Sequence, residues 1–481
     1  MRATAGALVV TLGSGCSVVC EGPGCAWQYP QGRLAVCDGS APADLDAWDD
    51  AELSYDGGAS LPEEDQGSGW SVGAVPVGTT YGGRILVGQP DANQVIALDA
   101  VDLRRVATWA GVTPKAEFGQ SLFVQPAPDA SGAFDLWVGA PGTDYGRGAV
   151  RLFRGAELDR VRSVPDLTIT GVTPNDRLGE RIVPCADLTG DRIPEVVVVA
   201  PFFSTPAEGW PYEPVPDLAG AVFLLLSENL GARPEPVTPW SLGPAWWGTE
   251  VGQGAGAAVS CDRDLDLDGA IDLVIGSPYA SGGRGSVSVL AEPLPESGPL
   301  TDPVTRVTVL GSVGALELFG ASFAALDVGT DTLFAIGAPG FANGSGRVHL
   351  VRGADLTGDA SPEDVADVRS TSDRIDIPDH IGKWLDSADL DGDLLEDLIV
   401  GAPDYKEDAQ NAFDAGRVWG WYASDWTTWG IGLSTDEAQV IVRGDAPFER
   451  VGRAVLAVDL DADDRAELIV PTRAAAPRDG G

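Results

Sequence analysis

The stretch that decides the fold reads Asp389-Leu-Asp391-Gly-Asp393-Leu-Leu395-Glu-Asp397, followed at once by Leu398-Ile399-Val400-Gly401-Ala402-Pro403 and further on by Gly416-Arg417-Val418. Short apolar runs that begin or end at Gly and Pro are typical of β-strands joined by turns. The segment therefore predicts two adjacent strands with an acidic loop in front of them.

The same pattern recurs along the chain, and internal repeats carry more information than any single motif. Seven units follow one another at roughly 50–75 residues, the spacing of a four-stranded propeller blade with variable loops. A single such sheet cannot bury both faces, so the units must stack around an axis. The units start at Ser71-Val72-Gly73, Phe118-Gly119, Leu178-Gly179, Val251-Gly252, Phe319-Gly320, Ile381-Gly382 and Val451-Gly452, and their apolar strands end at Gln89-Pro90, Ala140-Pro141, Ala200-Pro201, Ser277-Pro278, Ala338-Pro339, Ala402-Pro403 and Val470-Pro471.

These Phe-Gly and Gly-Ala-Pro motifs resemble the FG-GAP repeat, which builds the seven-bladed β-propeller of integrin α subunits and of many bacterial surface proteins. The resemblance covers about residues 70–471. It implies an all-β fold with seven blades and a binding role.

The two ends of the repeat region predict how the ring closes. After Pro471 too few residues remain for the outer strands of the last blade, whereas Gly32-Arg-Leu-Ala-Val-Cys37 matches the Gly-Arg strand of the other units. We therefore expect residues 31–60 to complete blade seven and protect its open edge. The alternative is a truncated last blade. The predicted propeller spans residues 31–471, followed by a tail at 472–481.

Four units carry an acidic nonapeptide between their first and second strands, with oxygen side chains at positions one, three, five and nine and a carbonyl expected to point inward at position seven. Hard oxygen ligands in this number suit Ca²⁺ better than zinc or copper. An acidic turn without metal is the alternative, but four copies at one repeat phase argue against it. The predicted ligands are Asp187, Thr189, Asp191, Ile193 and Glu195 in loop A (187–195); Asp264, Asp266, Asp268, Ala270 and Asp272 in loop B (264–272); Asp389, Asp391, Asp393, Leu395 and Asp397 in loop C (389–397); and Asp459, Asp461, Asp463, Arg465 and Glu467 in loop D (459–467).

The loops depart from the family pattern at position six, where the resemblance implies glycine and a positive φ. Only Gly269 keeps the glycine, and Arg192, Leu394 and Asp464 replace it. We expect about four structural Ca²⁺ ions and none in the first, second and fifth units, where the spacing is incomplete. All the predicted ligands are protein oxygens, which leaves little room for a catalytic water.

The composition and the N-terminus indicate export. The formal net charge of −41 disfavours nucleic-acid binding. Arg2 precedes a short apolar stretch that ends before Cys16, so residues 1–16 read as an export signal, with either lipidation of Cys16 or ordinary cleavage. Residues 17–30 form a Cys-containing linker. Export permits disulfides among the six cysteines, but their connectivity does not follow from the sequence.

The sequence favours a monomeric binding or adhesion module on the cell surface over an enzyme. The chain has only two histidines, His349 and His380, both at repeat positions, and no nucleophile or phosphate-loop motif. The ligand is a protein or a glycan. A lectin-like propeller is the alternative, because the 14 tryptophans could stack on sugars; a hydrolase-associated propeller is a further one, since a related propeller accompanies a phospholipase D. Insertions at 202–219 and 404–415 are candidate contact loops.

Overall fold

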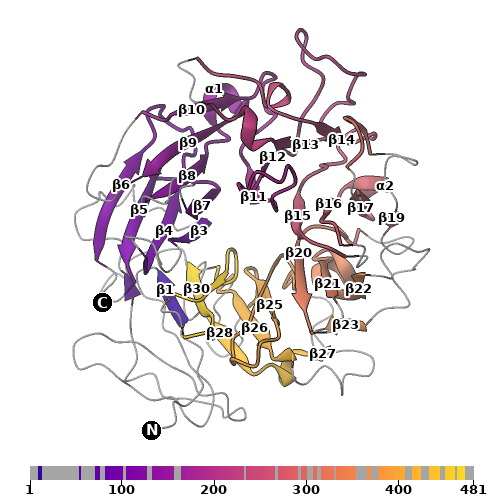
Figure 1. The fold of residues 1–481 in the computed structure, drawn as a ribbon. Coiled ribbons are helices and arrows are strands. Elements are labelled where there is room, and N and C mark those ends of the chain that lie inside the picture. Colours follow the sequence, from indigo (N-terminus) through magenta and orange to yellow (C-terminus); the bar gives the residue numbers. More distant parts are fainter. Residues whose placement is uncertain are drawn as a thin grey trace, which may run out of the picture.

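The computed structural model is a ring of β-sheets arranged around a central axis, with the sheets following one another in chain order (Figure 1). The predicted all-β propeller is confirmed. The structure describes residues 9–12, 54–55, 71–75, 82–100, 104–126, 133–156, 164–231, 235–265, 269–290, 294–300, 307–310, 316–329, 332–353, 366–369, 378–406, 414–423, 433–444, 450–460 and 463–471.

Six of the sheets are complete blades of four antiparallel strands, and the first strand of each lies nearest the axis. We number the blades in chain order. Blade one contains β3 (Ser71–Val75), β4 (Arg84–Gln89), β5 (Gln94–Asp99) and β6 (Arg105–Ala110); blade two contains β7 (Leu122–Pro126), β8 (Phe134–Gly139), β9 (Ala149–Ala156) and β10 (Leu167–Thr170); blade three contains β11 (Arg181–Pro184), β12 (Val196–Ala200), β13 (Ala221–Leu225) and β14 (Ala245–Trp247). Blade four contains β15 (Ala258–Arg263), β16 (Asp272–Ser277), β17 (Ser286–Leu290) and β19 (Val307–Leu310); blade five contains β20 (Phe323–Asp327), β21 (Thr332–Gly337), β22 (Val348–Arg352) and β23 (Ala366–Arg369); blade six contains β24 (Trp384–Ala388), β25 (Asp397–Ala402), β26 (Arg417–Trp421) and β28 (Val440–Arg443).

The seventh sheet is built differently. It takes β29 (Leu456–Val458) and β30 (Glu467–Pro471) from the end of the repeat region, and β1 (Val9–Leu12) pairs with β30 in parallel, followed by β2 (Ser54–Tyr55). Among the described residues, six complete blades therefore stand where seven were expected. The predicted closing strand, Gly32–Cys37, lies outside the described residues, and β1 falls within the predicted export signal.

Short elements connect the blades. β18 (Gly298–Pro299) leaves blade four to pair in parallel with β14 of blade three, and β27 (Leu433–Ser434) links blade six to β23 of blade five in the same way. Such added strands cover otherwise open edges. The helices in the described part of the chain are single turns: α1 (Thr143–Gly146), α2 (Ala280–Gly283), α3 (Phe341–Gly344), η2 (Ser227–Asn229), η3 (Pro239–Ser241) and η7 (Thr435–Glu437).

Blade-to-blade packing explains the repeated glycines. A Cβ on Gly139 of blade two would lie 2.1 Å from the carbonyl oxygen of Gly179 at the start of blade three, and a Cβ on Gly401 would lie 2.3 Å from that of Gly452. No side chain fits where two backbones approach so closely. Gly179 also has a φ of +89°. The repeat motif therefore marks the joint between neighbouring blades.

Two predicted motif positions were wrong. Gly73 lies inside β3 and does not open the blade. In blade four the joint glycine is Gly256, not Gly252: its φ is +92°, and its N–H donates to the carbonyl of Gly276, as the N–H of Gly119 does to Gly139. Three closely spaced glycines, 252, 254 and 256, made the sequence ambiguous at this point.

The core lies between the blades. All residues of β8, β12, β16 and β25 are buried, because both faces of these strands pack against neighbouring sheets. One cluster joins Trp137 and Val150 of blade two to Val198 and Phe223 of blade three. At about 1.5–3 kcal/mol per buried large apolar side chain, such clusters hold the ring together.

Candidate metal centres

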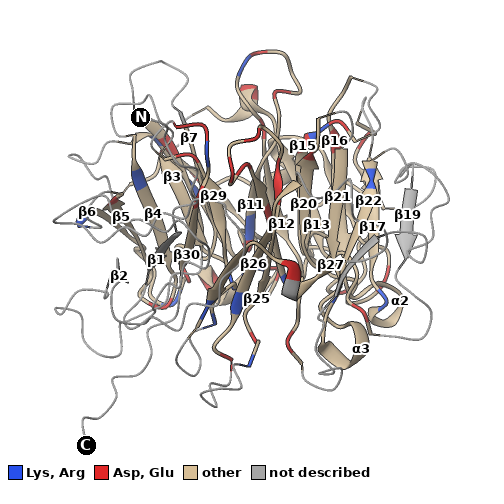
Figure 2. Cartoon of the chain, turned by 90° about the horizontal axis from the view of Figure 1, so that it is seen from below, with Lys and Arg blue, Asp and Glu red and all other residues tan. Residues whose placement is uncertain are grey.

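The four acidic loops lie at equivalent places in the ring. Loops A, B and C connect the first and second strands of blades three, four and six, and loop D connects β29 to β30. Connections between the first and second strands all emerge at one end of the blades, which run side by side in Figure 2. We call this end the acidic-loop face.

Position nine is a buried carboxylate that holds the start of its own loop. Glu195 and Asp397 are fully buried, and Asp272 and Glu467 nearly so. Each accepts a hydrogen bond from the N–H of the leucine at position two, at 2.6–2.8 Å. The four pairs are Leu188–Glu195, Leu265–Asp272, Leu390–Asp397 and Leu460–Glu467.

Position one caps the turn and fixes the backbone at position six. The carboxylate of Asp389 accepts from the N–H of Leu394 at 2.8 Å, and Asp187 accepts from Arg192 at 2.7 Å; loops B and D have the same pair, Gly269–Asp264 and Asp464–Asp459. Position six has positive φ in all four loops, between +67° and +93°. The predicted need for a left-handed residue is therefore confirmed, and three loops meet it with a side chain that disfavours it.

Loops A and C bring carboxylate oxygens close enough to share one ion. Asp187, Asp191 and Glu195 each place an oxygen within 4.8 Å of the others, as do Asp389, Asp391 and Asp397. Two oxygens each about 2.4 Å from the same Ca²⁺ lie at most about 4.8 Å apart. The geometry and the hard oxygen donors therefore fit a calcium ion in both loops.

The remaining predicted ligands lie around these clusters. In loop A, the Thr189 hydroxyl donates to Glu195 at 3.0 Å, and the N–H of Ile193 donates to Asp191 at 2.8 Å. In loop C, Asp393 accepts from the N–H of Leu395 at 2.9 Å. Arg465 in loop D donates its N–H to Asp463 in the same manner, at 3.1 Å. Asp266, Asp268 and Asp461 lie outside the described residues, while Ala270 lies in the described part of loop B.

Loops A and C differ in their electrostatics. Burial, together with the charges of Asp391 and Asp389, raises the pKa of Asp397 to about 8. Burial and the neighbouring Asp393 raise the pKa of Asp391 to about 6. In loop A, by contrast, the Ser227 hydroxyl donates to Asp191 at 2.6 Å and, with the N–H of Ile193, lowers the pKa of that carboxyl. Crowded carboxylates resist ionisation unless a cation compensates them.

Neighbouring acidic loops are also in direct contact. The N–H of Ala466 in loop D donates to the carbonyl of Asp389 in loop C at 2.7 Å. The Arg465 side chain lies against Gly392 of loop C. Nothing in the spacing of the motifs predicts that position seven of one loop contacts the next loop.

A disulfide joins Cys185 to Cys261 beside loops A and B. The bond links the first strands of blades three and four, and the N–H of Ala186 donates to the carbonyl of Cys261 at 2.9 Å. The pairing of these cysteines does not follow from the sequence alone. Their position just before the acidic loop in adjacent units was the signal that could have suggested it.

The opposite end of the blades carries exposed apolar side chains. Val251 is 75% exposed, Leu316 68% and Tyr279 50%, and Leu218 is also exposed. Their loops touch across blades three to five: the N–H of Gly252 donates to Asp217, the N–H of Ser281 donates to Glu250, and the N–H of Leu318 donates to Gly283. We call Leu218, Val251, Tyr279 and Leu316 the apolar loop patch; α2 and α3 lie at the same end (Figure 2).

Most described tryptophans are used for packing. Trp109, Trp137, Trp246, Trp419 and Trp421 are almost fully buried. The insertion at 202–219 folds back onto its own blade, where Trp210 contacts Trp240 and Trp247 with ring centroids 5.2 and 5.3 Å apart. This arrangement favours packing over a sugar platform for these rings.

The two histidines occupy repeat positions, as expected. His349 is buried against Phe319, and the Nδ1 of His380 lies 2.8 Å from Asp404. Within the described residues, no helix is both long and apolar enough to cross a bilayer.

Comparison with known proteins supports the predicted resemblance. The chain is 25% identical to integrin α-5 of Xenopus laevis over 237 residues, 48% of this chain and 20% of that protein. It is 38% identical to human integrin α-D over 165 residues, 32% of this chain and 13% of that protein. It is 28% identical to human phosphatidylinositol-glycan-specific phospholipase D over 382 residues, 70% of this chain and 41% of that protein.

The chain thus spans less than half the length of each of these relatives. No protein-family model matches it. Among solved structures, hydrazine synthase of Kuenenia stuttgartiensis aligns over 86% of this chain and 99% of its own, with 12% identity and a TM-score of 0.46, which supports no functional inference.

Proposed function

Because the chain is an integrin-α-like β-propeller, we propose that it is an exported, calcium-stabilised module that binds a protein partner through the apolar loop patch. The observation that carries the proposal is the gathering of four exposed apolar side chains on touching loops at one end of the ring. One end has acidic loops whose carboxylates hold their own backbone, and the other exposes large apolar side chains from three adjacent blades.

Calcium belongs to the proposal because the same hydrogen-bond pattern recurs in four loops. Asp187, Asp191 and Glu195 would hold one ion, and Asp389, Asp391 and Asp397 another. Loops B and D would hold two more, with the remaining ligands as predicted from the sequence. A bound ion neutralises the crowded carboxylates and fixes the turn; the chemistry it supplies is structural.

The apolar loop patch supports a protein partner. Large apolar side chains gathered on contiguous loops are typical of protein contact sites. Aromatic residues such as Tyr279 are enriched in the centres of such interfaces.

The disulfide supports export. A disulfide such as Cys185–Cys261 persists in oxidising compartments and is rare in the cytosol.

Removal of residues 1–16 as a signal would also remove β1, leaving the edge of β30 unpaired. We propose that residues 31–60 then pair with β30 and complete a seventh blade, since open edges invite aggregation. A chain beginning at residue 17 should melt cooperatively, whereas one beginning at residue 61 should aggregate.

The binding face is tested by photo-crosslinking. A photo-reactive amino acid at Tyr279 should capture a discrete partner from the cell surface when calcium is present. The matched control is Val164, which is 73% exposed in the connection between β9 and β10, at the acidic-loop end. Capture at position 164 but not at 279 would place the partner on the wrong face and refute the assignment.

A further inference from the structure

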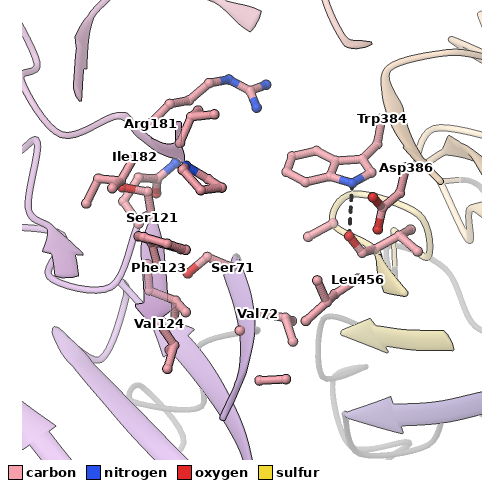
Figure 3. Close-up of a pocket in the computed structure, with 18 of the residues that line it drawn as sticks. Ser71, Val72, Ser121, Phe123, Val124, Arg181, Ile182, Trp384, Asp386 and Leu456 are labelled. Atoms are coloured by element: carbon pink, nitrogen blue, oxygen red, sulfur yellow. Dashed lines mark hydrogen bonds between the residues drawn. The ribbon is translucent and has the colours of Figure 1, made fainter. Parts of the chain in front are cut away.

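A pocket of about 620 Å³ opens at the centre of the ring, where the innermost strands converge (Figure 3). Its walls come from β3, β7, β11, β24 and β29, which belong to blades on every side of the axis. This volume lies within the range of small-molecule sites, about 300–1,000 Å³. Neither the acidic loops nor the apolar loop patch contributes to it.

Two side chains from opposite sides of the ring meet in this pocket. The guanidinium carbon of Arg181, in blade three, lies 5.3 Å from the ring centroid of Trp384, in blade six. The indole is held in place, because its Nε1–H donates to the carbonyl of Val455 at 3.1 Å (Figure 3). A cation over an indole face is attracted to it, but the contact leaves the guanidinium N–H donors unused.

The Arg181 guanidinium has no hydrogen-bonding or ionic partner among the described residues. The neighbouring Glu180 is already engaged, accepting from Arg177 at 2.8 Å and from Gln120 at 3.2 Å. Asp386, in the same pocket, accepts from the N–H groups of Ala457 and Ser387 at 2.9 and 3.0 Å. Burial lowers the pKa of Arg181, and the nearby charge of Glu180 offsets this only in part.

The rest of the lining is mostly apolar. Val72, Phe123, Val183 and Leu456 line the pocket beside Trp384. A ligand that fits this surface has an apolar body. To offset the desolvation of Arg181, it also carries an anionic group that accepts two parallel N–H hydrogen bonds from the guanidinium. A second negative charge on the ligand would be repelled by the strongly acidic protein.

We propose that the central pocket binds a small organic monoanion, a carboxylate on an apolar body, with the carboxylate paired to Arg181 and the body packed against Trp384 and Phe123. The site is separate from the surfaces in the proposed function and does not depend on calcium or on a protein partner. The ring supplies a rigid site, because both key side chains stand on innermost strands.

Isothermal titration with phenylacetate tests this site, with the uncharged 2-phenylethanol as the comparison ligand. Phenylacetate should bind with a stoichiometry of one, and the alcohol about tenfold more weakly or not at all, because a hydroxyl cannot form the charge-assisted pair with the guanidinium. Arg181→Gln should weaken phenylacetate at least tenfold. Arg453→Gln, which changes an arginine of the same pocket that already has a partner, should leave binding nearly unchanged.

Melting curves of both variants show whether the fold is intact. Failure of the wild-type protein to bind phenylacetate overturns the proposal. Equal affinity for the acid and the alcohol would also overturn it, and so would an equal loss of phenylacetate affinity in the two variants. Either result would show that binding does not depend on the charge of Arg181. A drop in the melting temperature of Arg181→Gln with unchanged affinity would show that the Arg181–Trp384 contact is only structural.

Discussion

Loops A and C share a backbone design but differ in the state of their carboxylates. Both hold position six with the carboxylate of position one, and both tie position nine to the N–H of position two. In loop A, a hydroxyl from outside the loop stabilises the ionised Asp191, whereas in loop C burial and crowding raise the pKa of Asp391 and Asp397. Hydrogen bonds within the loop thus determine its backbone conformation. The surroundings of the loop determine how strongly its ionised carboxylates repel one another, and so how much a bound cation would stabilise it.

Removal of calcium should have the largest effect. A site whose Kd lies a hundredfold below the free calcium concentration stabilises the fold by about 2.7 kcal/mol, so chelation should lower the melting temperature markedly. Asp389→Ala should abolish more of this calcium-dependent shift than Asp187→Ala, because the ion relieves greater repulsion in loop C. Calorimetry with and without EGTA measures both. If both variants keep the full shift, neither loop binds calcium.

The pH dependence without calcium separates the two loops next. A carboxyl with a raised pKa in the folded state stabilises the fold fully below its unfolded pKa, near 4, and this contribution is lost as the pH rises through the folded pKa. In EGTA, the free energy of unfolding should therefore fall between about pH 4 and the values near 6 and 8 of Asp391 and Asp397.

Asp391→Asn should flatten this decline, because an amide oxygen still accepts from the N–H of Asp393 without the charge. Asp191→Asn in loop A is the matched change, and its effect on the pH dependence should have the opposite sign. The lowered pKa of Asp191 stabilises the fold above the unfolded pKa, and this stability is lost on acidification, so the variant should lose less stability at low pH. Denaturant titrations across pH measure both slopes. Identical slopes in the two variants would contradict the assigned difference.

Glycine at position six should have the smallest effect. Leu394 and Arg192 have φ values of +68° and +72°, a conformation that costs a side-chain residue about 1–2 kcal/mol. Leu394→Gly and Arg192→Gly should each stabilise the protein by up to about 1 kcal/mol, after the entropic cost of glycine. Gly269→Ala in loop B should destabilise it by a similar amount. Chemical denaturation measures all three, and a destabilising Leu394→Gly would show that the leucine makes a contact worth more than the strain.

The fold could be predicted largely from the repeat, because its motifs are steric requirements. Gly139 and Gly179 face each other across a blade joint, so each unit must carry glycine at both places. The same steric rule failed in blade four, where three nearby glycines could each satisfy it and only packing selects Gly256. The loop spacing groups the acidic residues by position, but only folding brings Asp389, Asp391 and Asp397 together in loop C, in a group that does not include Asp393.

What the sequence determined by itself is local: strands, acidic turns, and the left-handed position six, since these depend on neighbours within about ten residues. Contacts between distant segments were decided only by the tertiary structure. Cys185 meets Cys261, Arg465 lies against loop C, and Arg181 crosses the ring to Trp384 because ring closure brings separate blades together. No spacing along one chain encodes such distances, because they arise only when all the sheets have packed around a common axis.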